Sequence, residues 1–290
     1  MSAPSALPAA LPVAAHAAVS PARQGAATAA IGLYDSGVGG LSVLSQVRQH
    51  LPAEDLIYVA DNAYVPYGEK PTSTIEARAC AIADQLLARG VKALGVACNT
   101  ATAAAIETLR RRHPGLPIIG IEPAVKPAAA LTRSGVIGVL ATSGTLASPR
   151  FVQLMQREAP QARVLLRPCP EWVALVERGD FDAPRHHDTL AAPVHALLAE
   201  GADVLVLGCT HFPFLLPRLR QIAGPDVTIL ETGSAFARQL QRRLDEAGLL
   251  NPRRDTVGAT QWLASGDTAG FERHVEALLH QRADCQRLPA

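Results

Sequence analysis

Short apolar runs alternate with amphipathic stretches through most of the chain. Residues 31–47, 55–71 and 92–112 each open with an apolar run bounded by turn residues, and 116–124 holds another. Apolar runs of this length indicate strands that are buried on both faces of a parallel sheet. Helical spacing follows most of these runs, so the pattern predicts repeated strand–helix units.

Two helices carry end signals. In the segment after the second strand, Ser73 and Glu76 have the spacing of a capping box. Near the C-terminal end, residues 234–250 have helical spacing, with Ser234 as the expected N-cap and Gly248 close to the helix end. A short strand near residue 260 and a helix over 270–281 complete the predicted elements.

The pattern of the first part is repeated further along the chain. Residues 134–148 resemble 31–42, and residues 202–219 resemble 92–106. The offset is roughly a hundred residues, as expected for an internal duplication. We therefore predict an α/β fold with two similar parallel-sheet lobes. Ligand would bind in the cleft between the carboxyl ends of the strands of the two lobes.

The predicted lobe boundaries follow from this repeat. The first lobe spans 31–122 and the second spans 123–231, while 232–290 packs back on the first lobe. Residues 1–30 are rich in Ala and Pro and lack a periodic apolar face. They are predicted to be a disordered extension that is dispensable for folding and activity.

Composition narrows the classes of function. The chain has 290 residues, of which 48% are hydrophobic and 18% charged, with a net charge of +1. This balance argues against nucleic acid or an anionic membrane as a partner. Five cysteines at wide spacings, without a CxxC pair, indicate neither a disulfide framework nor a zinc site. We expect reduced thiols, no metal and a cytoplasmic protein.

Two cysteines occupy equivalent places in the repeat. Cys98 and Cys209 each lie between an apolar strand and a following helix, and each is followed by polar residues. The positive end of a helix would lower a thiol pKa towards neutrality, which suits acid–base catalysis. Burial as small apolar residues is the alternative, but the matched positions favour chemistry. Cys80, Cys169 and Cys285 have no such setting.

Further polar residues are predicted near the same strand ends. Asp35 and Ser36 open a Gly-rich turn, and Tyr67 and Gly68 belong to a Pro/Gly loop. Each could be plain turn chemistry; their positions at the predicted cleft favour ligand contact. Glu177 is interpreted as a solvated helix residue on its own pattern. Glu122 and Lys126 are expected to form a salt bridge in the hinge between the lobes.

The motifs resemble those of the glutamate racemase family. The matched strings span about residues 31–280, and CNTA together with GCTHFP in this order is specific to this family and its aspartate-racemase relatives. The PYG loop and the Cys169–Gly179 stretch favour glutamate over aspartate. The strings are DSGVGG (35–40), PYGEK (66–70), ACNTAT (97–102), GIEPAVKPA (120–128), VLATSGT (139–145), VALVERG (173–179) and GCTHFP (208–213).

The resemblance implies a role for each matched residue. Cys98 and Cys209 would remove and deliver the α-proton of glutamate from opposite faces, assisted by Asp35, Glu177 and His211. It also implies a cofactor-independent enzyme that supplies D-glutamate for peptidoglycan. A muramyl-peptide activator is implied for some relatives, and the oligomeric state stays open, a homodimer being one option. The implied substrate contacts are Asp35, Ser36, Tyr67, Gly68, Asn99, Thr100, Thr210 and His211.

The sequence departs from the family pattern at one position, and three alternative functions are considered. Glu231 stands where the family often has Asp, so no function is assigned to that turn. Pyridoxal phosphate needs a Schiff-base lysine, but of Lys70, Lys92 and Lys126 none lies beside a phosphate cradle. A racemase for aspartate or another amino acid, a Cys-His-Asp amide hydrolase and a ligand-binding regulator are the alternatives. The hydrolase would leave the second thiol without a role.

Overall fold

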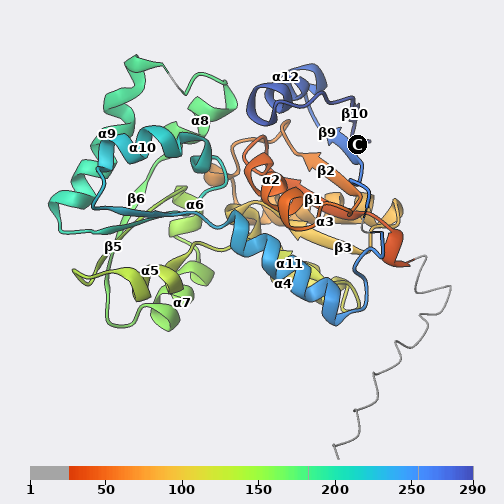
Figure 1. Ribbon diagram of the computed structural model, residues 1–290, viewed down its shortest axis with the longest axis horizontal. Helices are drawn as coiled ribbons and strands as arrows, with labels where there is room; N and C mark the ends of the chain where they lie inside the picture. Colours follow the sequence, from red (N-terminus) through yellow and green to blue (C-terminus); the bar gives the residue numbers. More distant parts are fainter. Residues whose placement is uncertain (1–25, 182, 254, 290) are drawn as a thin grey trace, which may run out of the picture.

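Two parallel sheets organise the chain in the computed structural model, which describes residues 26–181, 183–253 and 255–289 (Figure 1). The first sheet has the strand order β10-β9-β2-β1-β3-β4, and the second has the order β6-β5-β7-β8. Every strand pair in both sheets is parallel. The strands are β1 (Ile31–Asp35), β2 (Leu56–Ala60), β3 (Ala93–Val96), β4 (Ile118–Gly120), β5 (Val136–Ala141), β6 (Arg163–Pro168), β7 (Val204–Leu207), β8 (Thr228–Leu230), β9 (Thr260–Ala264) and β10 (Cys285–Arg287).

Helices cover both faces of each sheet. In the second lobe, α8, α9 and α10 lie on one side of the sheet and α5 and α7 on the other (Figure 1). In the first lobe, α2 packs against α11 and α12, while α3 packs against α4. The helices are α2 (Leu41–His50), α3 (Thr72–Ala88), α4 (Asn99–Arg112), α5 (Val125–Leu131), α6 (Ser143–Leu146), α7 (Pro149–Glu158), α8 (Pro170–Glu177), α9 (His187–Ala199), α10 (Leu216–Ala223), α11 (Gly233–Glu246) and α12 (Thr268–Leu279), with 3₁₀ helices η1 (Tyr67–Glu69), η2 (Pro184–His186) and η3 (Phe212–Leu215).

The predicted duplication is visible in the strand order. The run β2-β1-β3-β4 of the first sheet corresponds to β6-β5-β7-β8 of the second. In each run, the second strand of the lobe pairs on one side of the first strand, and the third strand pairs on its other side. The two halves therefore share one topology, and each has a switch point between its central strands, where open α/β sheets bind ligands.

Burial explains why the strands are so apolar. All residues of β1, β2, β3 and β7 are buried, as expected where helices cover both faces. The register sets strand ends level with one another: Asp35 pairs with Ala60, and Tyr34 pairs with Val96. Residues that follow these strands consequently emerge at one edge of the sheet.

The C-terminal elements contribute to the first lobe. Strands β9 and β10 extend its sheet beyond β2, and α12 lies on that side of the lobe (Figure 1). Tyr58 of β2 stacks on Phe271 of α12 with ring centroids 5.8 Å apart, and Trp262 of β9 lies 6.0 Å from Tyr58. Aromatic contacts of this kind bury large apolar areas and hold the segments together. β10 was missed because Cys285–Arg287 is short and has no apolar run.

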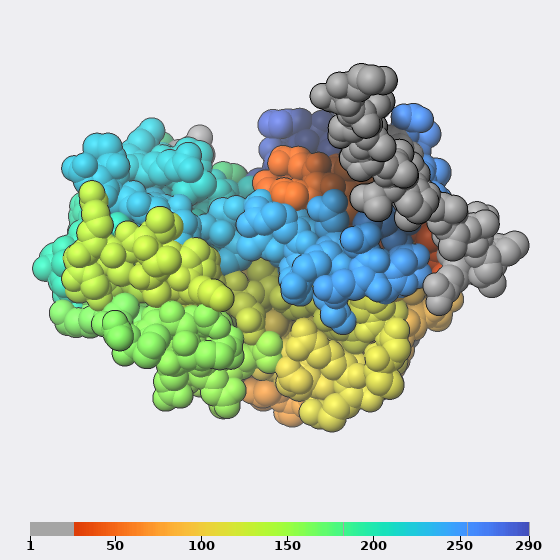
Figure 2. Space-filling model, turned by 60° about the horizontal axis from the view of Figure 1, so that its bottom comes forward, coloured from red at the N-terminus to blue at the C-terminus, as the bar shows by residue number. Residues whose placement is uncertain are grey.

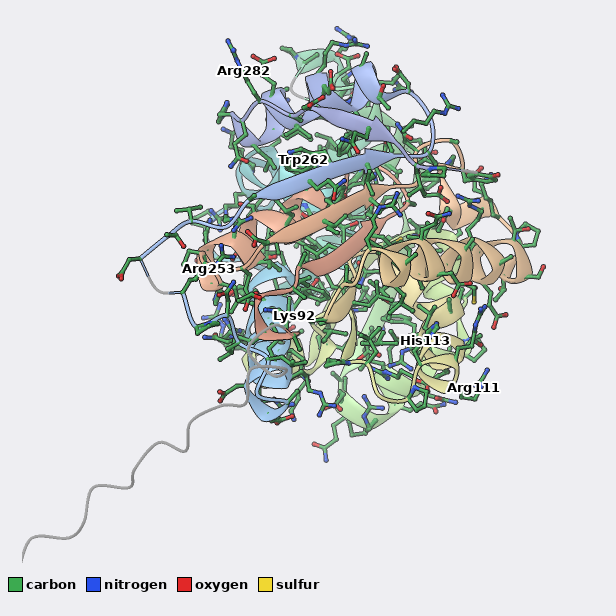
Figure 3. The ribbon with its side chains drawn as sticks, turned by 90° about the vertical axis from the view of Figure 1, so that its right-hand side faces the viewer. Lys92, Arg111, His113, Arg253, Trp262 and Arg282 are labelled. Carbon is green, nitrogen blue, oxygen red and sulfur yellow. The ribbon has the colours of Figure 1, made fainter. Side chains whose placement is uncertain are left out.

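A buried ion pair lies at the amino ends of β2 and β3, where it contacts the start of the described chain. Lys92 and Glu54 form a salt bridge with side chains that are 1% and 2% exposed. The Lys92 ammonium also donates to the Ala27 carbonyl, and Glu54 accepts from the Asn251 amide at 2.8 Å. Figure 3 shows Lys92 inside the fold, with Arg253 on the nearby loop.

Three local expectations are corrected. Residues 26–30, assigned to a disordered extension, are placed, with Ala27 buried; the rest of the predicted extension lies outside the described residues. Pro71 rather than Ser73 precedes α3, and no side chain caps that helix. Thr232 is the N-cap residue of α11, so Ser234 lies within its first turn. Gly248 does follow α11, at φ +66°.

Candidate active site

The two central strands of the first lobe end at Asp35 and close to Cys98. Cys98 has extended backbone angles and is the N-cap of α4, where its Sγ accepts from the Ala101 amide at 3.4 Å. Ser36 lies next to it, with its Oγ 3.7 Å from the Cys98 Sγ. The strand–cysteine–helix arrangement predicted for this thiol is confirmed.

The corresponding strand of the second lobe ends close to Cys209. This residue follows β7 and precedes η3, and its Sγ lies 3.6 Å from the His211 Nδ1. Cys98 and Cys209 are both buried, at 5% and 7% exposure, and both line one cavity of about 20 Å³ between the lobes. The other residues that line it are Ser36, Pro66, Tyr67, Gly68, Asn99, Thr100, Thr142, Val173, Thr210 and His211.

His211 is held by an acidic partner from the same lobe. Its Nε2 lies 2.6 Å from the Glu177 Oε1, and that oxygen also accepts from the Val38 amide of the first lobe at 2.9 Å. Burial lowers the pKa of His211, but hydrogen bonds with Cys209 and Glu177 outweigh it and raise the pKa well above its ordinary value. Burial raises the pKa of Glu177, yet its bond with His211 produces a net lowering. The pair is therefore imidazolium and carboxylate, and Glu177 is no solvated helix residue.

Asp35 lies behind the cavity on the first lobe. It is fully buried and accepts from the Gly37 amide at 2.8 Å and from the Thr210 hydroxyl at 3.1 Å. Burial raises its pKa, with His211 and the Gly37 amide opposing that shift. Asp35 and Glu177 do not line the cavity itself; each reaches it through one intermediate side chain of the second lobe, Thr210 or His211.

The environment of Cys98 overturns one expectation. Burial, followed by the nearby Asp35 carboxylate, raises the pKa of this thiol, and its hydrogen bonds with the Ala101 amide and the Ser36 hydroxyl offset the shift only in part. The helix N-terminus does supply its amide, but desolvation disfavours the thiolate more strongly. The predicted lowering of the Cys98 pKa is therefore wrong, and Cys98 is a thiol in this arrangement.

The lobes approach each other through glycine backbone. A Cβ at Gly37 would lie 2.0 Å from the Glu177 Oε1, and one at Gly39 would lie 2.4 Å from the His211 Nδ1. Ser42 of α2 also donates to the Thr210 carbonyl at 2.7 Å. The Gly-rich turn after β1 is thus the surface against which the acidic and imidazole groups of the second lobe are seated.

Sequence reasoning named Thr100 but missed Thr142 and Thr145, whose hydroxyls cluster with that of Thr100 beside the cavity. Thr142 Oγ1 lies 2.9 Å from those of Thr100 and Thr145, and all three residues are buried. Thr142 and Asn99 both line the cavity, and the Asn99 Oδ1 is buried without a hydrogen-bond partner among the described residues. The internal repeat carried the signal, because Thr142-Ser143-Gly144 corresponds to Asp35-Ser36-Gly37.

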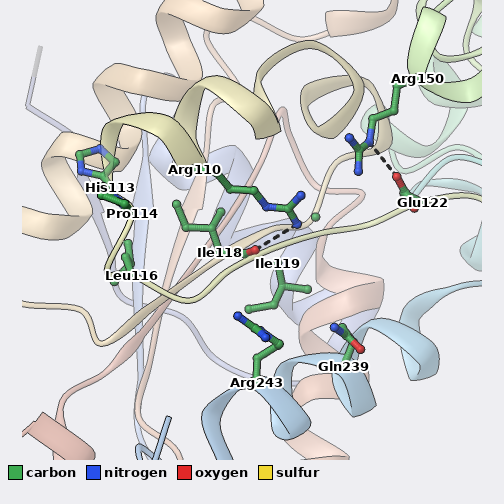
Figure 4. Close-up of a pocket in the computed structure, with 11 residues that line it drawn as sticks. Arg110, His113, Pro114, Leu116, Ile118, Ile119, Glu122, Arg150, Gln239 and Arg243 are labelled. Carbon is green, nitrogen blue, oxygen red and sulfur yellow. Dashed lines mark hydrogen bonds and ion pairs between the residues drawn. The ribbon is translucent and has the colours of Figure 1, made fainter. Parts of the chain in front are cut away.

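A larger cavity of about 520 Å³ lies away from the two thiols. Arg110 of α4, Arg243 of α11 and Arg150 of α7 line it, as do His113 and Glu122 (Figure 4). It opens on the face shown in Figure 2, where α11 (light blue) lies above α4 (yellow) and beside α7 (green). Arg150 binds Glu122 at 2.7 Å, and Lys126 faces Glu158, so the expected Glu122–Lys126 bridge is wrong.

Among the described residues, no group of three or more His, Cys, Asp or Glu side chains could hold a metal. Lys92 is committed to Glu54 and away from the cavity. Glu231 accepts from the Gly233 amide at 2.6 Å and so serves the turn before α11. No helix in the described part of the chain is long and apolar enough to cross a membrane.

Comparison with known proteins agrees with this geometry. Residues 39–240 match the model of the Asp/Glu/hydantoin racemase family. The chain belongs to this family. Among curated relatives, the glutamate racemase of Ectopseudomonas mendocina is 52% identical over 88% of this chain and 96% of its own length. That of Methylococcus capsulatus is also 52% identical, over 86% of this chain and 91% of its own.

Solved structures of family members have the same fold. Glutamate racemase from Escherichia coli, in complex with L-glutamate and the activator UDP-MurNAc-Ala, is 33% identical, with a TM-score of 0.77 over 89% of this chain and 97% of that one. An isoform from Bacillus anthracis is 30% identical, with a TM-score of 0.80 over 90% and 97%. The α/β fold with two parallel-sheet lobes is therefore confirmed, and the resemblance seen in the sequence reflects membership of this enzyme family.

Proposed function

We propose that the protein interconverts L- and D-glutamate without a cofactor, with Cys98 and Cys209 as acid and base on opposite faces of the α-carbon. One observation carries this proposal: the two thiols come from equivalent strand ends of two similar lobes and line one cavity. The names of the relatives support glutamate as the substrate. A hydrolase would use one thiol only, and a binding protein would need neither.

The two thiols have different environments. His211 lies beside Cys209, with its Nδ1 3.6 Å from the Cys209 Sγ, whereas burial and the Asp35 carboxylate raise the pKa of Cys98. We therefore assign Cys209 as the base and Cys98 as the acid in one direction of the reaction. The Cys209 thiolate removes the α-proton, and the Cys98 S–H bond breaks as its proton is delivered to the opposite face. The product state then has a Cys98 thiolate and a Cys209 thiol, and the reverse reaction starts from it.

The remaining residues bind the substrate and stabilise charge. Glutamate carries one ammonium and two carboxylate groups. Hydroxyls of Ser36 and Thr100, together with backbone amides of Tyr67 and Gly68, suit the carboxylates, while Thr210 lines the same cavity with its hydroxyl donated to Asp35. The unpartnered Asn99 Oδ1 suits the ammonium group. Exclusion of water from the ligand-bound cleft would strengthen these dipoles at the moment when negative charge develops on the α-carbon.

Isotope exchange tests the two-thiol mechanism. Starting from one enantiomer in deuterium oxide, the product should carry deuterium at the α-carbon while the remaining substrate stays largely protiated early in the reaction. Cys98→Ser and Cys209→Ser should each reduce racemisation severely, because a hydroxyl is a far weaker acid and base near neutral pH. Cys285→Ser is the matched control. Turnover near wild type in either site variant, or product that keeps its original hydrogen, would contradict the mechanism.

The substrate range has its own test. Chiral chromatography of L-glutamate, L-aspartate and L-glutamine incubated with the pure protein should show rapid racemisation of glutamate alone. Faster turnover of aspartate would overturn the substrate assignment.

For a glutamate racemase, we propose the bacterial cytoplasm as the location and the supply of D-glutamate for peptidoglycan as the biological role.

We further propose that an activator of the UDP-MurNAc-Ala type binds the larger cavity. The E. coli relative is described with this activator. Three arginines from three helices suit a diphosphate, and Arg150 lies in the second lobe whereas Arg110 and Arg243 pack with the first. A ligand bound to all three would therefore influence how the lobes are placed relative to each other.

Calorimetry and kinetics with UDP-MurNAc-Ala test this assignment. Arg110→Ala and Arg243→Ala should each weaken binding and activation by about tenfold or more, as loss of a charged phosphate contact predicts. Arg111→Ala changes a neighbouring arginine outside the cavity and should leave both unchanged. Wild-type affinity in the first two variants would place the activator elsewhere.

A further inference from the structure

A chain of side chains connects the surface of α3 with the cavity loop at Tyr67 and Gly68. Arg78 of α3 donates to Asp61 through Nε at 3.0 Å and through a terminal nitrogen at 2.8 Å. The Tyr67 hydroxyl donates to the same carboxylate at 2.5 Å. Arg78 is 22% exposed and Asp61 fully buried. The order is therefore surface arginine, buried carboxylate and cavity-lining tyrosine.

The buried carboxylate depends on both partners. A fully buried Asp61 is costly unless it is paired, and a two-pronged guanidinium contact is the strongest pairing available. The Arg78 guanidinium is itself fixed, because its central carbon lies 4.0 Å from the centre of the Tyr64 ring. Asp61 does not line the cavity, and its two oxygens already accept three hydrogen bonds. It is thus placed to hold its neighbours rather than to take a proton from substrate.

The loop that contains Tyr67 and Gly68 has little freedom to shift. Gly68 lies so close to the second lobe that a Cβ there would be 2.9 Å from the Thr142 Cβ. Conversely, a Cβ at Gly144 would be 2.9 Å from the Gly68 carbonyl oxygen. Displacing such a loop by about an ångström misaligns the groups that contact the ligand.

We propose that Arg78 is a positioning residue that sets the affinity for glutamate, because through Asp61 it fixes the Tyr67–Gly68 loop against the second lobe. This inference rests on the proposed racemase function. The thiols lie on other elements, so loss of Arg78 changes substrate binding more than proton transfer.

Chemical rescue tests the proposal with the full-length protein. Arg78→Ala should raise the KM for glutamate by about tenfold or more while kcat changes less than about threefold. Guanidinium chloride at low millimolar concentration should lower that KM again, because the vacated guanidinium position reaches solvent. Arg78→Lys keeps the charge without the two-pronged contact and should have an intermediate KM. Arg89→Ala, at the end of the same helix, is the matched control. Its KM should equal that of the wild type and should not change when guanidinium chloride is added.

Tyr67→Phe provides a second arm if Arg78→Ala folds poorly. It removes only the hydrogen bond to Asp61 and leaves the Arg78–Asp61 pair intact, so KM should rise without any response to guanidinium. An unchanged KM in both variants would overturn the proposal, as would a fall in kcat at constant KM. Wild-type protein in the same assay separates the two ideas: its failure to racemise glutamate refutes the proposed function, whereas an active wild type with unaffected variants refutes only the role of Arg78.

Discussion

At the scale of single residues, the clearest constraint is the space beside Glu177 and His211. Gly37 and Gly39 have no Cβ, and the second lobe uses that space for its carboxylate and imidazole. Glu177 cannot easily retreat, because His211 and the Val38 amide both hold its Oε1. One methyl group at Gly37 would therefore displace the pair that orients Cys209.

We expect Gly37→Ala to lower kcat/KM for glutamate by about a hundredfold, as an ångström-scale misplacement predicts. Gly115→Ala is the matched control, because a Cβ at Gly115 meets nothing within 4 Å. Steady-state kinetics of both variants provide the measurement. A Gly37→Ala protein with wild-type kinetics would show that the contact between the lobes is looser than the structure indicates.

The charges of Glu177 and His211 predict a pH dependence of stability. The raised pKa of His211 stabilises the folded protein fully below its ordinary value of 6.5, and this contribution is lost as the pH rises through the folded pKa. The lowered pKa of Glu177 contributes above its ordinary value of 4.5 and is lost as the pH falls through its folded pKa. Both contributions are complete between these two pH values.

Glu177→Gln keeps the shape of the side chain and removes its charge. Denaturant unfolding of wild type and variant should show the largest difference in unfolding free energy between pH 4.5 and 6.5. The difference should then shrink towards alkaline pH as His211 loses its proton. A difference that grows with rising pH would mean that His211 is neutral in the folded protein.

Cys98 and Cys209 could be located from the sequence because equivalent positions in an internal repeat can be recognised without a structure. The raised pKa of Cys98 was not predictable in this way, because it depends on burial and on Asp35, which lies on a different strand. The helix pattern around Glu177 indicates a solvated residue. The family resemblance implied a role for it, but only the fold brings His211 and the Val38 amide to it. Thr142 could have been predicted, since its position in the second repeat corresponds to that of Asp35 in the first.

At the scale of elements, buried apolar runs predicted the strands well, and capping residues predicted helix starts poorly. Ser73 and Glu76 have capping-box spacing, yet α3 begins directly after Pro71, whose fixed φ suits a helix start. Polar spacings of this kind recur by chance, whereas a run of buried apolar residues does not. The small strand β10 lacks such a run and depends on its pairing with β9.

The N-terminal segment gives a prediction at the same scale. A protein that starts at residue 26 retains the Ala27 carbonyl, whereas one that starts at residue 31 leaves the buried Lys92 ammonium with Glu54 alone. A buried charged donor that loses a partner is costly, by about 1–3 kcal/mol. The shorter protein should therefore have a lower melting temperature in calorimetry, and the longer one should match the full chain. Equal melting temperatures would show that Ala27 contributes nothing.

At the scale of the whole molecule, the duplicated topology explains why the site has two similar halves. Each lobe presents its switch point, between β1 and β3 or between β5 and β7, and each contributes one thiol there. A proton can then be removed on one face of a substrate and delivered on the other without rotating the substrate. The placement of one lobe against the other depends on contacts such as Ser42 with Thr210, which no periodicity in the sequence reveals.

The size of the cavity implies that the lobes separate during each cycle. A space of about 20 Å³ holds little more than a single water molecule, so glutamate cannot reach the thiols while the lobes stay this close. Opening must expose the two segments that meet across the cavity mouth, the loop at Tyr67–Glu69 and helix α6, whose closest approach is at Gly68 and Gly144. Strand β1 lies in the core of one lobe and should be unaffected, because an opening of this kind moves lobes as units.

Hydrogen–deuterium exchange can detect this motion. Peptides that contain the loop and α6 should exchange measurably in the free protein, and saturating D-glutamate should slow them by about tenfold or more, since a ligand that contacts both lobes shifts the population away from the open forms. Peptides from β1 (Ile31–Asp35) are the internal control, and their exchange should not change. If saturating D-glutamate, with occupancy verified by calorimetry, left the loop and α6 exchanging as in the free protein, then substrate would have to reach the thiols without separation of the lobes.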